Sequence, residues 1–550
     1  MAKKSSKKQA AAPWQAPQWL QLLTIGLLML VLALFFFRKI DLTTADLGRH
    51  LKNGEVVLTE GQFITKNVYS FTHPEFPVVT HHWASGVIFY LVYLAADFGG
   101  LTVFSALLAV FTFYFLLRTG GERNGWGAAL LVAAILLPLL GKRVEIRPES
   151  FSYLLFAVFI FFCHRWHKGQ LNFRQLALWL LPLQLLWVNL HIQFVLGIGV
   201  VGAFMLGAAL NQKRAAARQL LTLSVGLVVI SLANPSGIYG LLEPFTIFRE
   251  YGYMVAENQP VWFMQGRALE NYQSGYSTNL IDFWRYLVFE LATLAALFTW
   301  GRQIARGSFR QNLAGFFILL AMLLLAWFTI RSLTLFAIAA VVFLPDGMRD
   351  IYRQQNRWRK AGYIVSFVVL LVAFFTPNGL YSPLKFTENQ QGERFYFTGL
   401  GLLNSPSRNL DVNGTAKFIK RYGIQGPIFN NYDIGSYLIW HLYPQEKVFV
   451  DNRPEAYPVE FFKQVYIPMQ EDEAIWQAQL EQHDFNAIVF YRNDMTPWGQ
   501  NFLISRVKDE KAWAPVFVDN FGIIFLRRNQ QNKPVIQQFE PRIRPMLQVR

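Results

Sequence analysis

The sequence predicts a polytopic α-helical membrane protein with a separate, more polar α/β domain at its C-terminal end. Of its 550 residues, 53% are hydrophobic and only 16% are charged, and the chain holds 50 Phe and 16 Trp. A soluble protein of this composition could not cover its surface with polar groups. Repeated apolar runs of roughly 15 to 20 residues are long enough to cross the hydrocarbon core of a bilayer as helices.

About eleven apolar runs are convincing spans, and the charge of the loops decides the status of a shorter run at 83–96. If 83–96 stays in the interface, Lys and Arg gather in the cytoplasmic loops, as the positive-inside rule requires. If it crossed, every later basic loop would change sides. This predicts a cytoplasmic N-terminus and an extracytoplasmic C-terminus. The expected spans are 18–37, 100–117, 126–141, 149–164, 174–188, 191–210, 218–233, 284–300, 313–330, 331–344 and 361–377.

The positive charge of the chain follows from this topology. The formal net charge is +16, but Lys and Arg lie mainly in short loops between apolar runs, so no nucleic-acid partner is expected. The basic stretch 1–17 precedes the first span without a small-residue cleavage site, which predicts an uncleaved cytoplasmic anchor. The single cysteine, Cys163, lies inside an apolar run, where packing is its expected role.

Two domains are expected. Residues 18–377 hold the spans and two long outer loops, 38–99 and 234–283. Residues 378–550 are more polar, and short apolar strands alternate there with helical stretches such as 471–482, a pattern typical of a small α/β unit. The strands are expected at 427–429, 447–450, 487–490 and 523–526.

A polar stripe shortly after the first span is the leading candidate for an active site. Asp46, Arg49, His50 and Asn53 fall at i, i+3, i+4 and i+7, so a helix places them on one face. An ionised Asp46 can accept a proton from an attacking hydroxyl or amine. Arg49 and His50 can hold a phosphate or orient the carboxylate. The alternative is that Asp46 only caps the helix.

A histidine pair precedes the run at 83–96. His81 and His82, beside Trp83, can bind a sugar, a phosphate or a divalent metal. Adjacent histidines point in different directions and no third ligand is fixed, so the pair alone is weak evidence for a metal. The alternative is an aromatic interfacial anchor flanked by solvated histidines.

The loop at 142–149 breaks the positive-inside trend, which suggests a local use for its charges. Three cations at the mouth of a helix bundle would stabilise a phosphate leaving group as its bond to a sugar breaks. The alternative is a loop of self-neutralising Arg–Glu pairs. The charged residues are Lys142, Arg143, Glu145, Arg147 and Glu149.

Further polar residues gather on the same predicted side of the membrane. Asn189 and His191 lie at the outer junction of two spans, and together with Asp46 they describe a polar cavity. Singly, each is explained by a cap or an interhelical hydrogen bond. In the last domain, the segments 431–440 and 451–455 stand out. Asp433 is expected to cap the helix that follows it, with acceptor binding as the alternative.

Several segments resemble one superfamily. They include DLGRHLKNGEVVLTEGQF, THHWASGVIFYLVY, IRPESFSYLLF, VNLHIQFVLG, NPSGIYGLLEP and NYDIGSYLIWHLYP. An acidic residue in a long first outer loop, a juxtamembrane helix, about eleven spans and a C-terminal extracytoplasmic domain resemble a GT-C glycosyltransferase. Within that superfamily, the chain is similar to the bacterial relatives of protein O-mannosyltransferases and of the lipid A aminoarabinose transferase.

The resemblance implies an inverting transfer of a sugar from a polyprenyl-phosphate donor to a lipid, glycan or protein acceptor. Asp46 would be the catalytic base, Arg143 or Arg147 would steady the departing phosphate, and no metal is required, although a divalent metal is compatible. The implied location is the bacterial inner (plasma) membrane, with the C-terminal domain in the periplasm or outside the cell.

The chain departs from the protein mannosyltransferases because Asp46 is followed by Leu47, where that family has an Asp-Glu pair. Asp41 is therefore the reserve base. No oligosaccharyltransferase signature stands out, so asparagine is not favoured as acceptor. The rival hypotheses are a transporter or flippase of a lipid-linked sugar and a non-catalytic scaffold. Charges at the outer ends of the spans, rather than near the midplane, favour interfacial chemistry over transport.

Overall fold

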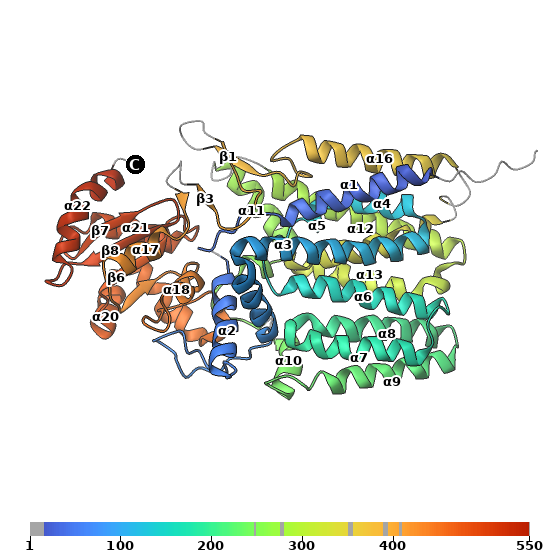
Figure 1. Ribbon diagram of the computed structural model, residues 1–550, viewed down its shortest axis with the longest axis horizontal. Coiled ribbons are helices and arrows are strands. Elements are labelled where there is room, and N and C mark those ends of the chain that lie inside the picture. Colours follow the sequence, from blue (N-terminus) through green and yellow to red (C-terminus); the bar gives the residue numbers. More distant parts are fainter. Residues whose placement is uncertain are drawn as a thin grey trace, which may run out of the picture.

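The helices form an elongated bundle, and the C-terminal domain packs at one end of it (Figure 1). The computed structural model describes residues 16–43, 45–246, 249–274, 280–349, 352, 356–388, 394–405 and 410–548. The bundle helices are α1 (Gln18–Phe36), α3 (Trp83–Asn124), α4 (Trp126–Ile135), α5 (Leu137–Leu140), α6 (Glu149–His167), α7 (Phe173–Leu190), α8 (Val195–Leu210), α9 (Arg214–Ile230), α12 (Ile281–Ala305), α13 (Leu313–Phe328), α14 (Leu333–Phe343) and α16 (Asn356–Phe375).

These segments are helical because an apolar chain in lipid must satisfy its backbone hydrogen bonds internally. Among the described residues, six helices are long and apolar enough to cross a membrane, so this is a multi-pass membrane protein and the count of eleven spans stays a prediction. The segment around α14 is 94% buried inside the protein, whereas α1 and α16 are mostly exposed at 33% and 28% buried. Helix α14 is therefore the centre of the bundle.

Two predicted segments bear on the layout of the bundle, and one of them differs from the prediction. The run at 83–96 forms the first part of α3 and is separated from the span after it by a break at Ala96 and Asp97, whose backbone is not helical, as the sequence predicts for a segment distinct from the span at 100–117. The predicted span 126–141 is divided into α4 and α5, since Pro138 near the start of α5 cannot continue an uninterrupted hydrogen-bond ladder.

The two outer loops carry short helices at the end of the bundle that faces the C-terminal domain. The first loop forms α2 (Leu47–Glu60), which packs on the first half of α3. Gly54 and Gly86 allow this contact, because a Cβ on Gly54 would lie 2.1 Å from the carbonyl oxygen of Gly86. The second loop forms α10 (Ile238–Thr246), the 3₁₀ turn η2 (Ala256–Asn258) and α11 (Val261–Gln273).

The C-terminal domain is built on a four-stranded sheet of order β5-β6-β8-β7. Strands β5 and β6 are parallel, and the other neighbours are antiparallel. The strands are β5 (Ile428–Asn430), β6 (Ala487–Tyr491), β7 (Trp513–Val518) and β8 (Gly522–Arg527). The helices around them are α17 (Gly414–Arg421), α18 (Gly435–Leu442), α19 (Pro468–Glu471), α20 (Glu473–His483), α21 (Pro497–Lys508) and α22 (Lys533–Gln548).

Three of the four predicted strands are confirmed, and the strand at 447–450 is wrong. There, Val448 makes only isolated bridges, one to Ile428 and one to Ser70 in the first outer loop. This segment therefore joins the domain to the loop instead of extending the sheet. Short two-stranded pairs, β1 (Phe386–Glu388) with β2 (Arg394–Tyr396) and β3 (Asn404–Ser405) with β4 (Leu410–Asp411), precede the sheet.

The C-terminal domain packs closely against the loop at 38–99. Helix α18 packs on α2 so closely that a Cβ on Gly48 would lie 2.6 Å from the carbonyl oxygen of Ser436. The backbone of Lys39 and Ile40 donates hydrogen bonds to the carbonyls of Phe397 and Gly401, at 2.7 and 2.8 Å. The loop at 38–99 and the C-terminal domain together cover this end of the bundle.

Candidate functional site

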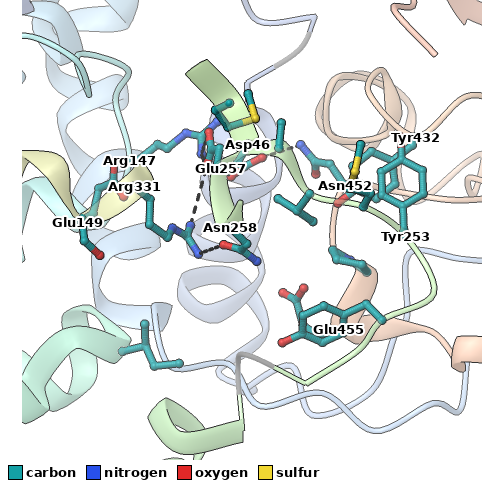
Figure 2. A pocket seen from close by; sticks show the side chains of 18 of the residues that line it. Asp46, Arg147, Glu149, Tyr253, Glu257, Asn258, Arg331, Tyr432, Asn452 and Glu455 are labelled. Carbon is teal, nitrogen blue, oxygen red and sulfur yellow. Dashed lines mark hydrogen bonds and ion pairs between the residues drawn. The ribbon is translucent and has the colours of Figure 1, made fainter. Parts of the chain in front are cut away.

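A cavity of about 1060 Å³ lies where the bundle, both outer loops and the C-terminal domain meet. Figure 2 shows that charged side chains from the bundle and the second loop face polar and aromatic side chains of the C-terminal domain across it. The lining residues that carry the following argument are Asp46, Arg49, His50, His81, His82, Arg147, Glu149, His191, Tyr253, Glu257, Asn258, Arg331, Tyr432, Asp433, Asn452 and Glu455.

Asp46 faces this cavity from the residue that precedes α2. It makes no side-chain capping bond to α2, so the helix-cap interpretation is wrong. Asn452 Nδ2 instead donates to Asp46 Oδ1 at 2.5 Å, and Arg147 Nη1 lies 3.7 Å from Asp46 Oδ2. Ser436 Oγ donates to the Asn452 Oδ1 and so directs the amide nitrogen towards Asp46. The carboxylate is thus oriented from two domains.

Arg49 lies beside Asp46, one turn into α2. Its side chain is buried at 5% exposure and lines the cavity. The Nε atom has no hydrogen-bond partner, and no carboxylate lies within ion-pair distance of the guanidinium in the described part of the chain. Burying a cation without a counter-ion is expensive, so this position calls for an anionic ligand.

Glu257 gathers three arginines on the bundle side of the cavity. Its carboxylate lies 2.5 Å from Arg143, 3.1 Å from Arg147 and 3.6 Å from Arg331. Burial alone would raise the pKa of Glu257, but the three guanidiniums outweigh it and hold that pKa well below its usual range. Arg331 also donates to Asn258 at 3.1 Å. The second outer loop thereby contributes a negative charge to a strongly cationic wall.

The self-neutralising interpretation of the 142–149 loop is confirmed in part. Arg143 makes a bidentate pair with Glu149, at 2.6 and 3.0 Å, and Arg147 pairs with Glu145 at 2.6 Å. Arg147 nevertheless reaches Asp46 and the cavity, whereas Arg143 lies behind it.

Four imidazoles form another wall, and His50, His81 and His191 among them are buried while His82 is partly exposed. The ring centroids of His81 and His82 lie 3.9 Å apart, His82 lies 5.3 Å from His50, and His82 lies 5.7 Å from His191. Burial lowers the pKa of His81 to about 4, and burial followed by the charge of Arg49 holds the pKa of His50 well below its usual range. These rings are therefore neutral at physiological pH. The expected solvated anchor is wrong for His81, which is 8% exposed.

An aromatic surface closes the opposite side. Tyr253 of the second loop stacks on Tyr432 of the C-terminal domain, with centroids 4.2 Å apart and planes at 23°. Asp433 follows Tyr432 and lines the cavity, and α18 has no side-chain cap, so the expected capping role of Asp433 is wrong. Burial, followed by the nearby carboxylates of Asp494 and Asp46, raises the pKa of Asp433 to about 7.

Eight of the twelve predicted site residues line the cavity: Asp46, Arg49, His50, His81, His82, Arg147, Glu149 and His191. The other four lie outside its lining. Lys142 pairs with Asp282 at 3.0 Å, and Asn189 accepts a hydrogen bond from Trp83 and donates to Ala233. Arg143 forms ion pairs with Glu149 and Glu257, and Glu145 forms one with Arg147. Asp41, the reserve candidate for the base, accepts a hydrogen bond from the backbone N–H of Thr43 and does not line the cavity.

Sequence reasoning missed residues that other segments bring to the cavity, chiefly Tyr253, Glu257 and Arg331. A single charged residue between two apolar runs was the available signal for Arg331, and Glu257 lay in a loop already noted as long and polar. The segment 451–455 stands out in the sequence, but the contact of Asn452 with Asp46 depends on how the C-terminal domain docks and could not be predicted from it.

The histidine pair suggested a metal as one option. Across the described residues, no group of three or more His, Cys, Asp or Glu side chains is arranged so that it could hold a metal ion. The imidazoles contact one another through their rings and do not converge on one point. The residues present therefore do not fit a metal as they stand, and no chemical step is routed through one.

The comparisons with known proteins identify the fold. No protein-family model and no curated protein matches the sequence. Among solved structures, the archaeal oligosaccharyltransferase AglB from Archaeoglobus fulgidus, in complex with an inhibitory peptide and a dolichol-phosphate, matches with a TM-score of 0.54 and 12% identity. The match covers 92% of this chain and 74% of that chain. The same protein in complex with Zn and sulfate matches with a TM-score of 0.50, 12% identity, and 84% and 67% coverage.

A third structure, ArnT from Cupriavidus metallidurans in the apo state, covers 92% of this chain and 97% of that chain, with 11% identity and a TM-score of 0.42. That overlap is too loose to carry an argument. The AglB matches confirm the GT-C-like fold that the sequence predicts. At 12% identity the likeness concerns the fold, so donor and acceptor are matters of proposal.

Proposed function

We propose that the protein transfers a sugar from a polyprenyl-phosphate donor to an acceptor on the extracytoplasmic side of the membrane. The observation that carries this proposal is the pairing of Asp46 with Arg49 in one cavity. A carboxylate that can accept a proton stands beside a buried guanidinium that forms no ion pair within 4.0 Å among the described residues. A phosphorylated lipid supplies the missing anion, and its sugar would lie next to the carboxylate.

The nature of the donor is supported by the fold. AglB, which shares it, was solved with a dolichol-phosphate. In this chain, Arg49, Arg147 and Arg331 line the cavity and supply cationic groups for one lipid phosphate. Arg143, which the sequence offered as a partner for the phosphate, is held by Glu149 and Glu257 and does not line the cavity.

The proposed chemistry is a single displacement with inversion at the anomeric carbon. The acceptor hydroxyl or amine attacks that carbon, its proton passes to Asp46, and the bond between the sugar and the phosphate oxygen breaks. The phosphate leaves with the electron pair of that bond, and the guanidiniums stabilise the charge that develops on it. The neutral imidazoles of His50, His81 and His82 can donate to and accept from sugar hydroxyls without adding charge.

The acceptor would enter from the side of the C-terminal domain. The stacked pair of Tyr253 and Tyr432 offers an apolar platform, and Asp433 and Glu455 add hydrogen-bonding groups to the same side. This chemistry suits a lipid, a glycan or a protein acceptor. The proposal places the N-terminus in the cytoplasm and the C-terminal domain outside the plasma membrane of a bacterium.

The test is transfer of radiolabelled sugar from synthetic polyprenyl-phosphate donors by the full-length protein in proteoliposomes, with total membrane lipid, glycan and protein fractions as acceptors. The proposal predicts label in one acceptor fraction and release of polyprenyl phosphate in equal amount. Label that stays on the donor but crosses the vesicle bilayer would identify a flippase instead. If the label is neither transferred to an acceptor nor moved across the bilayer with any donor, the remaining hypothesis is a non-catalytic scaffold.

A further inference from the structure

His191 lies at the junction between α7 and α8, where the chain leaves helical geometry. Its backbone is extended, with φ −163° and ψ 145°. The junction is tied to the start of α3: Trp83 Nε1 donates to Asn189 Oδ1 at 2.8 Å, and Ser85 Oγ donates to the carbonyl oxygen of Leu190 at 2.5 Å. These bonds hold the imidazole of His191, which is 8% exposed, in the wall of the large cavity.

One ring nitrogen of His191 is engaged by a hydrogen-bond chain inside the bundle. Trp187 Nε1, on α7, donates to Ser152 Oγ, on α6, at 2.8 Å, and Ser152 Oγ lies 2.8 Å from His191 Nδ1. Trp187 and Ser152 are both 0% exposed. Gly197 lets α8 pack closely here, since a Cβ at that position would lie 3.1 Å from the Trp187 ring. The chain is therefore shielded from water.

This hydrogen-bond chain fixes the tautomer of His191. The indole N–H of Trp187 can only donate, so it occupies one lone pair of the Ser152 hydroxyl. Among the described residues, His191 Nδ1 is the other partner of that hydroxyl, so the Ser152 proton points to it. Burial disfavours a charged imidazolium. The opposite tautomer would leave the Ser152 proton without an acceptor in a dry interior, which is costly. The ring proton of His191 is therefore on Nε2.

The Nε2–H of His191 is directed to the cavity. Since Nδ1 is turned into the bundle, the opposite edge of the ring is the one that lines the cavity. Within the part of the chain that the structure describes, no atom accepts a hydrogen bond from Nε2. The neighbouring ring of His82, with its centroid 5.7 Å away, makes a ring contact instead. A rigidly held, neutral donor thus faces the space that a substrate would fill.

The charges around His191 favour an uncharged ligand group. The charged residues that act on it most strongly are Glu149, Arg331 and Arg143. Arg143 and Glu149 neutralise each other as a bidentate pair, and Arg331 lies 3.6 Å from the carboxylate of Glu257. A phosphate or an ammonium group would find no spare counter-ion among them. A sugar hydroxyl accepts a hydrogen bond from an N–H without bringing a charge.

We propose that His191 Nε2–H donates a hydrogen bond to a hydroxyl oxygen of the transferred sugar, with Ser152 as the positioning residue that keeps the proton on Nε2. The inference rests on the proposed function and names its substrate class: a sugar with a free hydroxyl at this position, not one that presents an ammonium group there. Ordinary interhelical hydrogen bonding explains why Trp187 meets Ser152. It does not explain why the chain ends on an imidazole that lines the cavity.

The test measures binding to the full-length protein in detergent by isothermal titration. The ligands are polyprenyl-phosphate glucose, mannose and galactose, and polyprenyl phosphate without a sugar. His191→Ala should weaken binding of the preferred hexose donor roughly 3- to 10-fold, the loss expected for one hydrogen bond, and should change binding of polyprenyl phosphate less than about twofold. Equal losses for both kinds of ligand, or no loss for either, would overturn the proposal.

Two conservative variants distinguish the ring nitrogens. The amide nitrogen of glutamine takes the place of Nε2, and that of asparagine takes the place of Nδ1. His191→Gln should therefore keep the preference for the hexose donor over polyprenyl phosphate, and His191→Asn should lose it. If His191→Ala fails to fold, equal hexose-donor binding by these two variants would overturn the proposal.

The positioning role of Ser152 has a spectroscopic readout. Nitrogen NMR of histidine-labelled protein in proteoliposomes should show the His191 proton on Nε2, with the signal assigned by its absence from His191→Gln. Ser152→Ala should mix the two tautomers and weaken hexose-donor binding about two- to fivefold. Ser150→Ala is the matched control, because the Ser150 hydroxyl is buried on the same helix without a hydrogen-bond partner among the described residues. It should change neither readout, and a wild-type proton on Nδ1 would overturn the proposal.

Analogues of the preferred hexose identify the hydroxyl. At the contacted position, removing the hydroxyl or replacing it with an amine should weaken wild-type binding about as much as His191→Ala does, and should cost His191→Ala little more. Equal losses in both proteins at every position would overturn the contact. If no hexose donor binds to the wild type, the proposed function itself fails. Donors that bind and transfer equally well with His191→Ala would overturn this inference alone.

Discussion

Asn452 donates a hydrogen bond of 2.5 Å to the carboxylate of Asp46, although 406 residues separate the two in sequence. Ser436 Oγ donates a hydrogen bond to the amide oxygen of Asn452, which directs the amide nitrogen towards Asp46. The C-terminal domain is therefore part of the candidate active site and not an appendage. Figure 2 shows Asn452 approaching Asp46 from the side opposite Arg147.

The Asn452 contact predicts a loss of turnover when it is removed. A hydrogen bond to a charged group contributes about 1.5–3 kcal/mol, so Asn452→Ala should lower kcat roughly 10- to 100-fold with little change in donor KM. Asn452→Asp should lower it further, because it places a second negative charge beside Asp46. Asn493→Ala, at an exposed amide of the same domain, is the matched control. Unchanged kcat in Asn452→Ala would show that Asp46 needs no orienting partner.

Arg49 should hold the donor phosphate. Losing one charge-assisted contact to a phosphate should raise donor KM or Kd roughly tenfold or more in Arg49→Ala, while Arg49→Lys keeps the charge and recovers part of the affinity. Arg421→Ala, an exposed arginine of the C-terminal domain, serves as control. Titration of the purified variants with donor lipid measures these affinities. A donor affinity in Arg49→Ala equal to that of the wild type would contradict the role of Arg49.

Glu257 neutralises the cationic wall that the donor phosphate would meet. Glu257→Gln keeps the shape of the side chain but removes its charge from Arg143, Arg147 and Arg331. We expect donor binding to become roughly two- to tenfold tighter, and thermal stability to fall because three arginines lose a counter-ion. Isothermal titration with the donor lipid and a thermal melt of each variant provide the two readouts. Weaker donor binding by Glu257→Gln would mean that the glutamate itself contacts the substrate.

Asp433 should make stability depend on pH. Because the pKa of Asp433 in the folded protein is raised to about 7, the unfolded chain ionises first, and stability is lost as the pH rises from about 4 through 7. Asp433→Asn removes this loss, so the variant should match the wild type at pH 4 and be more stable by on the order of 4 kcal/mol at pH 8. Thermal melts at both pH values measure it, with Asp484→Asn as an exposed control. If Asp433→Asn changed the melting temperature by the same amount at both pH values, the assigned pKa of Asp433 would be wrong.

The contact between α2 and α3 should tolerate no side chain at Gly54. Gly54→Ala places a methyl group 2.1 Å from the Gly86 carbonyl oxygen, so the helices must separate, at a cost of about 1–3 kcal/mol. That separation also moves Asp46 and His50, so activity should fall with the melting temperature. In Gly26→Ala, nothing lies within 4 Å of the new methyl group, and stability should hold or rise. Equal melting temperatures for the two variants would refute the close packing.

Most of what the sequence could predict depends on local pattern. The apolar runs and the polar stripe from Asp46 to His50 are periodic features, and the helices and the cavity follow from them. The break at Ala96 and Asp97 falls where the sequence separates the run at 83–96 from the span at 100–117. The segment at 447–450 has a strand pattern, but its partners lie in two different parts of the fold, so it forms bridges instead of a sheet strand.

The rest of the candidate site depends on docking between distant segments. Asn452 becomes significant only once Ser436 and α2 are brought together, and Glu257 only once the second outer loop meets the arginines of the bundle. Packing of this kind is set by shape and buried area over whole surfaces. The segment 451–455 stands out in the sequence, but nothing in it predicts that Asn452 meets Asp46, and no residue pattern near Glu257 predicts its contacts with the arginines.

The most direct measurement compares wild type with Asp46→Asn for transfer of radiolabelled sugar from a polyprenyl-phosphate donor in proteoliposomes. Asparagine fills the same space beside Asn452 and Arg147 but cannot accept the proton, so transfer should fall by at least about 100-fold, with donor binding and melting temperature little changed. Transfer at the wild-type rate by a folded Asp46→Asn protein would contradict the account and remove Asp46 from the chemistry.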